Sequence, residues 1–373
     1  MKSKNAEIAI IIGTRAELIK TFPIMLELKK QNIPYYFIHT GQHGLKDLCE
    51  KFSIKQPDVI LTREPEGGSK FYAKASKALF WNFSLIFKIR RKLRELKNLK
   101  YVLYHGDTMS TASAALASSK LLNPFKKYKN VHLEAGLRSE NYFEPFPEEI
   151  SRIIAGKFSD ILLAASPRSM NNLKKYRNKK KIILTGNTIL DSANFAYKRA
   201  IQRKIKPLSK ERFALISIHR HENIKSKERL EKIVEILQTL DMPSFFALHD
   251  NTKKMLIKYG LYEKLRSNRG IILTEPLDYV SYIYQISKCS LIICDGGSLQ
   301  EESLIFKKPC IILRKATERQ EGLETNFQFL SKLDVDKTIE KIKEYSSPQF
   351  RVREFDNPYG KKGLSRKIIE KLE

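Results

Sequence analysis

Three acidic residues, Asp107, Glu134 and Glu148, stand where short apolar segments end or where a proline turn opens a helix. Asp107 lies in His-Gly-Asp-Thr, Glu134 in Leu-Glu-Ala-Gly-Leu-Arg and Glu148 in Pro-Glu-Glu. Taken singly, each acid is better explained by helix capping or by an ion pair with Arg138 or Arg152. Carboxylates gathered beside an anionic substrate have raised pKa values, which suits them to proton transfer. Their joint placement favours an acid/base site.

Two glycine-containing turns have the composition of phosphate-binding loops. Gly13-Thr14-Arg15 opens a helix whose first amides would face a phosphate, and Arg15 would neutralise it. In Asp295-Gly296-Gly297-Ser298 the glycines allow a pyrophosphate to approach, Ser298 can cap the helix or bind the phosphate, and Glu302 would suit ribose hydroxyls. Simple helix capping is the competing interpretation. No GxGxxG or Walker sequence occurs, so a nicotinamide cofactor or ATP hydrolysis is not supported.

Histidine and cysteine spacing gives little sign of a metal centre. His219 and His221 are spaced as two ligands on a strand, but no third ligand is evident, so contact between His219 and a phosphate is favoured. The four cysteines form no CxxC pair, which indicates a reducing compartment. We expect no metal and no organic cofactor.

Short apolar runs alternate with helix-length segments along the whole chain. The expected strands are 6–13, 34–40, 101–106, 131–134, 161–165, 182–185, 213–219, 244–248, 271–274, 291–294 and 310–313. Runs too apolar to alternate, joined by helices such as Glu17–Lys30, predict parallel strands covered on both faces. Two such series predict an α/β fold of two Rossmann-like, doubly wound domains. The expected segments are 1–187, 188–355 and a terminal helical segment, 356–373.

The net charge of +28 is the most unusual bulk property. It raises nucleic acid, an anionic membrane or acidic ligands as partners, but the lysines and arginines form no single block, which favours solvated helices. The basic, amphipathic segment Leu79–Leu96 either contacts an anionic membrane peripherally or simply covers a sheet. Met1–Glu7 is not a signal peptide, and no apolar stretch reaches the roughly 20 residues that span a bilayer. We expect a cytoplasmic protein.

The ordered set of motifs resembles the non-hydrolysing UDP-N-acetylglucosamine 2-epimerases over essentially the whole chain. The matching residues are Gly13-Thr14-Arg15, Thr40-Gly41-Gln42-His43, Gly106-Asp107-Thr108, Glu134-Ala135-Gly136-Leu137-Arg138, Pro147-Glu148-Glu149, Gly186-Asn187-Thr188, His219-Arg220, Gln300-Glu301-Glu302, Glu318-Arg319 and Asn357-Pro358-Tyr359-Gly360. The resemblance implies the glycosyltransferase-B architecture with a nucleotide-sugar cleft between two domains. It also implies a terminal helix packed on the first domain, and a homodimer.

The resemblance further implies a reaction. UDP is eliminated from the anomeric carbon to leave a glycal, and re-addition gives the epimer at carbon 2. Such a reaction needs acid/base groups and a stabilised leaving group but no redox cofactor. The family serves surface or envelope polysaccharide synthesis.

The roles that the resemblance implies are carried over by position. Asp107, Glu134 and Glu148 would be the catalytic carboxylates. His219 and Arg15 would stabilise departing UDP. The remaining matches would bind the nucleotide sugar, and they are Arg138, Gly296, Gly297, Ser298, Glu302 (ribose), Arg319, and Gln42 with His43, where some bacterial members bind a regulatory substrate molecule.

Several positions depart from the family pattern. Ala16 and Gln320 replace prolines, Gly296-Gly297-Ser298 replaces Ser-Gly-Gly, and Lys361-Lys362 replaces an acidic-glycine pair. The exact sugar therefore stays open, as does hydrolysis in place of re-addition. The alternatives are a glycosyltransferase of the same architecture, a silent nucleotide-sugar binder, and a basic nucleic-acid or membrane-surface protein, which would show steeply salt-dependent binding.

Overall fold

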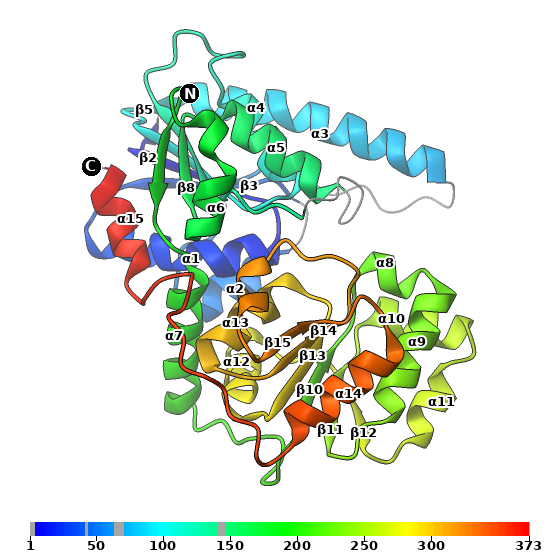
Figure 1. Ribbon diagram of the computed structural model, residues 1–373. Helices are drawn as coiled ribbons and strands as arrows, with labels where there is room; N and C mark the ends of the chain where they lie inside the picture. The colour runs from blue at the N-terminus through cyan, green and yellow to red at the C-terminus, as the bar shows by residue number, and fades with distance from the viewer. Residues whose placement is uncertain (1–3, 42–43, 63–70, 140–146, 373) are drawn as a thin grey trace. The chain divides into compact units, whose positions relative to one another are not determined.

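The computed structural model describes residues 4–41, 44–62, 71–139 and 147–372 (Figure 1). The chain divides into two compact units. The first comprises Met1–Ser192 with Pro358–Glu373, and the second comprises Ala193–Asn357. The division falls inside helix α7 (Ile189–Gln202), whereas the sequence suggested a division just before it. Among the described residues, no helix has the length and apolar content needed to cross a bilayer.

The first unit is built on a seven-stranded parallel sheet in the order β4-β3-β2-β6-β7-β8-β9. The strands are β2 (Ile8–Ile12), β3 (Tyr35–His39), β4 (Val59–Ile60), β6 (Tyr101–His105), β7 (Lys129–Ala135), β8 (Ile161–Ala164) and β9 (Lys181–Leu184). All five residues of β2 are buried, as a central strand covered on both faces requires. A separate two-stranded pair joins β1 (Lys4–Asn5) to β5 (Leu96–Lys97).

The helices of the first unit follow its strands. They are α1 (Arg15–Lys30), α2 (Lys46–Lys51), α3 (Phe71–Arg94), α4 (Met109–Ala117), α5 (Glu148–Phe158), α6 (Pro167–Asn172) and α15 (Leu364–Leu372). Leu85 and Ile89 of α3 are buried in one apolar cluster with Ala9 and Ile11 of β2. Helix α3 therefore covers the sheet. The terminal helix α15 belongs to this unit and packs against α1.

The second unit is built on a six-stranded parallel sheet in the order β12-β11-β10-β13-β14-β15. The strands are β10 (Ala214–Ser217), β11 (Ser244–Ala247), β12 (Ile271–Thr274), β13 (Leu291–Cys294), β14 (Cys310–Ile312) and β15 (Gln328–Leu330). Its helices are α8 (His221–Ile224), α9 (Lys227–Gln238), α10 (Asp250–Lys258), α11 (Tyr262–Ser267), α12 (Tyr279–Lys288), α13 (Gly297–Phe306) and α14 (Val335–Ser346).

Alternate residues of the central strand β13 pack on opposite faces of the second sheet. Ile293 joins a cluster with Ile233 of α9, whereas Ile292 joins a second cluster with Ile283 of α12. Burial on both faces explains why these strands are apolar throughout. The two sheets confirm the prediction of two doubly wound α/β units, and they gather the carboxyl ends of their strands at one edge of each sheet.

Candidate active site

The turn from β2 into α1 is fixed by a buried acid. Both carboxylate oxygens of Glu17 are used: the amides of Gly13 and Thr14 donate to Oε2 at 2.6 and 2.9 Å, and the Thr108 hydroxyl donates to Oε1 at 2.5 Å. Burial raises the pKa of Glu17. A β-carbon at Gly13 would lie 2.4 Å from the Ser110 hydroxyl, so only glycine fits. The turn is rigid, while the Arg15 side chain beside it is half exposed and ion-paired with Asp47 at 2.8 Å.

Asp107 follows β6 and is held by a buried arginine. Its Oδ2 accepts from Arg152 Nη2 at 2.7 Å and from Arg152 Nε at 3.0 Å. The Asp107 side chain stays 23% exposed, whereas that of Arg152 is buried. The preceding residue, Gly106, has a φ of +76°, which glycine adopts without strain and which turns the chain at the end of the strand. The Asp107 carboxylate is thus oriented by the buried Arg152 and is still reachable from solvent.

A neutral histidine supports that turn from the neighbouring strand. The Nε2 of His132 on β7 lies 2.7 Å from the Gly106 carbonyl oxygen, and the ring is buried. Burial lowers the pKa of His132 to about 4, so the ring is neutral at pH 7. In the tautomer that this contact requires, Nε2–H donates to the carbonyl. His132 therefore holds the Gly106-Asp107 turn by a hydrogen bond that protonation at moderate pH does not disturb.

Glu134 lies near the end of β7 in a strained backbone conformation. Its φ is +61°, and the pairing of β7 with β8 shifts register between Leu133 and Ala135. A non-glycine residue held there costs about 1–3 kcal/mol and re-aims the side chain, a feature common at functional sites. The neighbouring acid Asp107 is on the adjacent strand end, because β6 and β7 pair in parallel. The strain points to Glu134 as a functional residue.

The Glu134 carboxylate is buried among polar partners. Lys20 of α1 donates to Oε2 across a buried ion pair, and Asn187 Nδ2 donates to the same oxygen at 2.7 Å. Nε2 of His105 lies 4.0 Å away, and burial, opposed by the Glu134 charge, lowers the pKa of His105 to about 4. The positive charge next to Glu134 is therefore Lys20. Lys20 could not be predicted as a site residue, because a lysine in an amphipathic helix is usually exposed.

The start of α5 separates two adjacent acids. Glu149 is buried, and its Oε2 accepts from the Ser139 amide at 3.1 Å and from Arg152 Nη1. Its Oε1 lies 3.6 Å from Nε of Arg138. Glu148 precedes it and is half-buried. Glu149 thus acts as a structural clamp that shares Arg152 with Asp107, which leaves Glu148 as the acid of this pair with a candidate chemical role.

In the second unit a buried acid organises the end of β10. Asp295 is fully buried and accepts from the amides of His219 at 3.1 Å and Arg220 at 2.9 Å, and from Asn223 Nδ2 at 3.1 Å. The His219 side chain stays 43% exposed, with Nδ1 at 3.5 Å from Asp295. This contact orients the ring and leaves its outer edge open. Such an arrangement suits a histidine that donates to an anion.

The glycine loop leads directly into α13. Gly296 is the N-cap residue, and a β-carbon there would lie 3.1 Å from Cε1 of His219. A β-carbon at Gly297 would lie 2.5 Å from Nη1 of Arg319. Ser298 is half-buried in the first turn. The first amides of this helix and the ring of His219 therefore share one small region, which suits an anion.

Arg319 and Glu302 are more enclosed than a surface contact with ligand would require. Arg319 is buried, donates from Nε to Glu301 at 2.8 Å, and pairs with Glu318. Glu302 is also buried. Burial of the Tyr279 ring, and after it the charge of Glu302, raises the pKa of Tyr279 well above its usual value. Gln42 and His43 lie outside the described residues. Within the described part of the chain, no three His, Cys, Asp or Glu residues cluster as a metal site.

Comparison with known proteins shows the family to which the chain belongs. A model of the UDP-N-acetylglucosamine 2-epimerase family matches residues 26–373. The chain belongs to this family.

A relative from Methanocaldococcus jannaschii, named UDP-N-acetylglucosamine 2-epimerase, is 32% identical over 381 residues, 98% of each chain. A Pseudomonas aeruginosa relative, named UDP-2,3-diacetamido-2,3-dideoxy-D-glucuronate 2-epimerase, is 32% identical over 323 residues, 84% of each chain. Among solved structures, the M. jannaschii UDP-GlcNAc 2-epimerase in complex with UDP-GlcNAc and UDP superposes with a TM-score of 0.81 at 31% identity, covering 99% of each chain. The family resemblance and the predicted fold are thereby confirmed.

Proposed function

We propose that this enzyme epimerises carbon 2 of a UDP-N-acetylhexosamine, converting UDP-N-acetylglucosamine to UDP-N-acetylmannosamine. The observation that carries the proposal is the pair Asp107 and Glu134, on adjacent strand ends, each in contact with a buried cation in a chain of this family. Two oriented carboxylates are the groups that a proton removal and a proton return require.

The proposed reaction runs in two balanced steps. A carboxylate removes the proton from carbon 2, the bond from carbon 1 to the UDP oxygen breaks, and a glycal and UDP result. UDP then adds back to carbon 1 while a proton is delivered to the other face of carbon 2. Asp107, Glu134 and Glu148 are the groups we propose for these transfers. Lys20 and Arg152 are positioning residues that compensate the carboxylate charges.

We propose that the second unit binds the leaving group. His219 and the backbone amides at the start of α13 would bind the diphosphate by donating hydrogen bonds to it, and Ser298 would add a hydroxyl donor. Glu302 would bind the ribose hydroxyls. Arg15 and Arg138 would act on the substrate from the first unit. Arg319 would act indirectly, because its ion pairs with Glu301 and Glu318 hold it against Gly297.

The sugar is the least constrained part of the proposal. The name of the P. aeruginosa relative describes an acidic diacetamido sugar, and Lys361-Lys362 would favour an anionic sugar in this chain as well. UDP-N-acetylglucosamine remains the first candidate because the structural neighbour was solved with it bound. We place the reaction in the cytoplasm, in precursor synthesis for surface polysaccharide, and the four buried, free cysteines suit that compartment.

The test is incubation of the purified chain with UDP-N-acetylglucosamine, followed by chromatographic separation of products. UDP-N-acetylmannosamine at equilibrium with substrate supports the proposal. Free N-acetylmannosamine with stoichiometric UDP would show a hydrolysing enzyme instead. If this substrate is inert while the acidic diacetamido sugar nucleotide is converted, the modified-sugar alternative holds. Transfer of the sugar to an acceptor would indicate a glycosyltransferase.

We also propose that the enzyme forms a homodimer through the outer face of α3. Phe83 and Phe87, one turn apart, are 59% and 54% exposed, and their rings meet edge to face at 5.1 Å. A second copy would bury both pairs. Analytical ultracentrifugation should give a dimer for the natural chain and a monomer for Phe83→Ser/Phe87→Ser. A monomeric natural chain would contradict the dimer, and vesicle binding lost with these same changes would assign α3 to a membrane.

A further inference from the structure

The loop between α4 and β7 carries two large apolar side chains in solvent. Phe125 is 95% exposed and Leu121 is 67% exposed, four residues apart. The Asn123 side chain anchors the loop: its Oδ1 accepts from Arg90 of α3 at 3.0 Å, and its Nδ2 donates to the Ala117 carbonyl at 2.7 Å. An anchored loop that presents a phenyl ring and a leucyl group to water suits insertion into an apolar phase.

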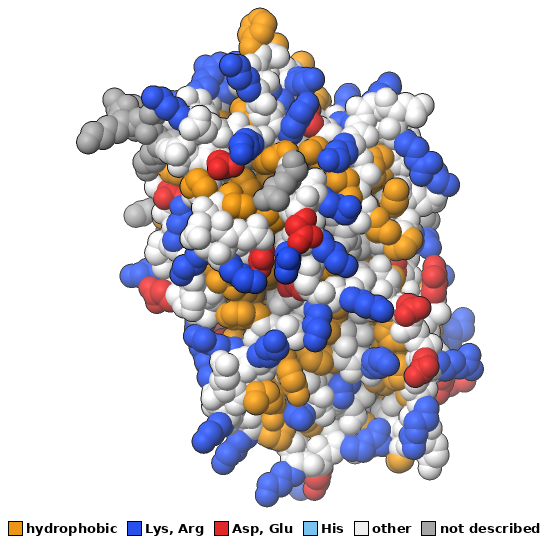
Figure 2. Space-filling model, turned by 90° about the vertical axis from the view of Figure 1, so that its left-hand side faces the viewer, with side chains coloured by type: hydrophobic (Ala, Val, Ile, Leu, Met, Phe, Trp, Pro, Cys, Tyr) orange, Lys and Arg blue, Asp and Glu red, His pale blue; other side chains and the backbone are white. Residues whose placement is uncertain are grey.

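The same loop and the strand that follows it are basic. Lys120, Lys127 and Lys129 are exposed and, in the part of the chain that the structure describes, make no ion pair with an acid. The fourth lysine, Lys126, is different, because its side chain is buried and paired with Asp160 at 2.6 Å. Lysine and arginine side chains are spread over the whole face drawn in Figure 2, so total charge alone says little. The distinguishing feature here is uncompensated charge beside exposed apolar groups.

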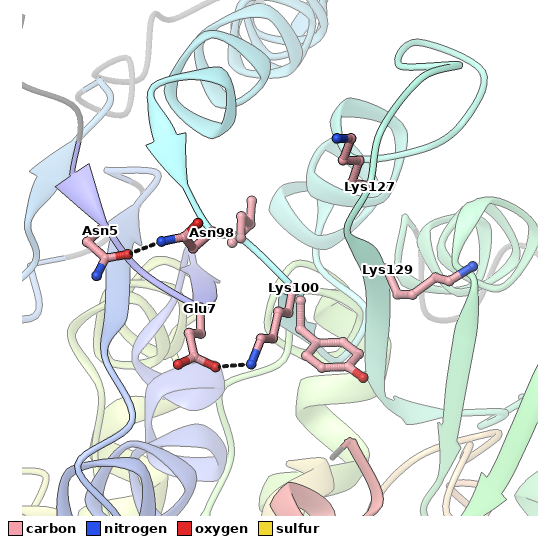
Figure 3. Close-up of a pocket in the computed structure, with 8 residues that line it drawn as sticks. Asn5, Glu7, Asn98, Lys100, Lys127 and Lys129 are labelled. Atoms are coloured by element: carbon pink, nitrogen blue, oxygen red, sulfur yellow. Dashed lines mark hydrogen bonds and ion pairs between the residues drawn. The ribbon is translucent and has the colours of Figure 1, made fainter.

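A hollow of about 620 Å³ lies next to these lysines, at the amino ends of the strands (Figure 3). On one wall Asn98 donates to Asn5 at 3.0 Å and Lys100 pairs with Glu7 at 2.6 Å. Lys127 and Lys129 stand on the opposite wall. Asn5, Lys100 and Lys127 offer donors to a phosphate at this hollow, whereas the Lys129 side chain extends away from the opposite wall. A second hollow of about 430 Å³ is lined in part by Arg90, Arg94 and Phe125.

We propose that this amino-terminal edge of the first sheet docks on an anionic phospholipid bilayer. In this docking edge, Leu121 and Phe125 enter the interface, while Lys120, Lys127 and Lys129 contact lipid headgroups. Apolar side chains flanked by cations bind such interfaces by combined burial and charge attraction. A nucleic-acid duplex would use the lysines but would gain little from Leu121 and Phe125, because its bases are already stacked.

The location of the docking edge is compatible with catalysis. Strands of a parallel sheet all point the same way, so their amino ends lie at the edge opposite their carboxyl ends. Asp107 and Glu134 are at the carboxyl ends, and Lys127 and Lys129 are at the amino ends. A bilayer on the docking edge would therefore leave the acid/base groups uncovered, and the inference does not depend on the proposed reaction.

The test is cosedimentation of the full chain with phosphatidylcholine vesicles that contain 0% or about 30% phosphatidylglycerol, at low and physiological salt. We expect binding to the anionic vesicles only, weakened by salt. Phe125→Ser and Lys127→Gln/Lys129→Gln should each weaken binding roughly tenfold. The controls are Ile257→Ser, an exposed apolar residue, and Lys254→Gln/Lys264→Gln, which remove equal charge from the second unit.

Three results would overturn the inference. One is absence of binding to anionic vesicles. Another is equal loss with the control lysines, which would assign the effect to net charge. The third is unchanged vesicle binding in Phe125→Ser together with tight binding to duplex DNA that needs Lys127 and Lys129, which would make this surface a nucleic-acid site. Circular dichroism and UDP binding, both expected to stay unchanged, show that each variant is folded.

Discussion

The acids at the strand ends of the two units have different partners. In the first unit, Asp107 and Glu134 are presented at strand ends and balanced by the buried cations Arg152 and Lys20. In the second unit, Asp295 accepts hydrogen bonds from the amides of His219 and Arg220, and the His219 side chain stays 43% exposed. The strand-end acids of the first unit are therefore suited to moving protons, and the strand ends of the second unit to holding an anion. The following changes test that division.

Replacing the carboxylate of Asp107 or of Glu134 should abolish turnover and leave nucleotide binding intact. Asp107→Asn and Glu134→Gln keep the size of the side chain and one acceptor oxygen but cannot accept a proton as a base. We expect kcat to fall by about a thousandfold or more, with the Kd for UDP within about twofold of the natural chain. Steady-state kinetics and calorimetry with UDP measure the two effects. A variant that loses UDP affinity in parallel with kcat would break the division between the units.

Removing Asp295 should act on the second unit alone. Asp295→Ala leaves the His219 and Arg220 amides and Asn223 without their buried acceptor, which costs about 3 kcal/mol of unfolding free energy. UDP affinity should also fall, because His219 loses its orientation. Urea unfolding and UDP calorimetry check both effects, with the exposed Asp336→Ala as control. Unchanged UDP affinity in a folded Asp295→Ala protein would contradict the role of Asp295.

The stability of the first unit should fall as pH is lowered from about 6.5 toward 4. The pKa values of His105 and His132 are about 4 in the folded protein, against about 6.5 unfolded. The unfolded chain therefore binds more protons in this window, and stability rises with pH. Each ring should contribute on the order of 1–2 kcal/mol between pH 7 and pH 5.

A comparison of variants isolates the contribution of one ring. His132→Asn should lower the unfolding free energy at pH 7, because the contact of the ring with the Gly106 carbonyl is lost. Because the variant also lacks the ionisable ring, its unfolding free energy should change less between pH 7 and pH 5 than that of the natural chain. Urea denaturation at the two pH values gives the difference. An equal pH dependence in both proteins would show that folding does not lower the pKa of His132.

The smallest effect concerns the hydroxyl in the glycine loop. Ser298→Ala should weaken UDP binding about threefold, the contribution of one hydrogen bond. The double change Gly296→Ser/Ser298→Gly moves the hydroxyl to the position that the family pattern has, and UDP affinity should stay within about threefold of the natural value. Calorimetry measures both. A loss larger than tenfold in the double variant would mean that Ser298 has a role which position 296 cannot supply.

Most of the fold could be predicted because its strands are central and apolar. The expected strands 271–274 and 291–294 are observed with those bounds. In the two large sheets the strands that escaped prediction, β4 and β15, lie at the edges and have only two and three residues, and the short pair β1 and β5 outside these sheets escaped it as well. Strands this short show no periodic pattern in the sequence. In β15 the polar residue Gln328 also interrupts the apolar run. Edge strands are defined by the neighbour they pair with rather than by their own composition.

The site was predictable at the level of residue types but not of partners. Strand-end position pointed to Asp107, Glu134 and His219. It could not show that Lys20, inside a helix, pairs with Glu134, or that Glu149 rather than Glu148 shares Arg152 with Asp107. The pairing of Lys20 with Glu134 and that of Arg152 with Asp107 join residues more than 40 positions apart in the sequence. Which of the two adjacent glutamates contacts Arg152 depends on the face of the helix that each one occupies. The roles of Gln42 and His43 remain predictions, because these residues lie outside the described chain.

We propose that the carboxylates of the first unit move a proton at carbon 2 of a UDP-sugar. Proton NMR of the chain with UDP-N-acetylglucosamine in deuterated water follows that proton. We expect UDP-N-acetylmannosamine that carries deuterium at carbon 2, and no such product with Asp107→Asn or Glu134→Gln. Product that keeps its original hydrogen at carbon 2, or product that still forms at the natural rate in those variants, would contradict the proposal.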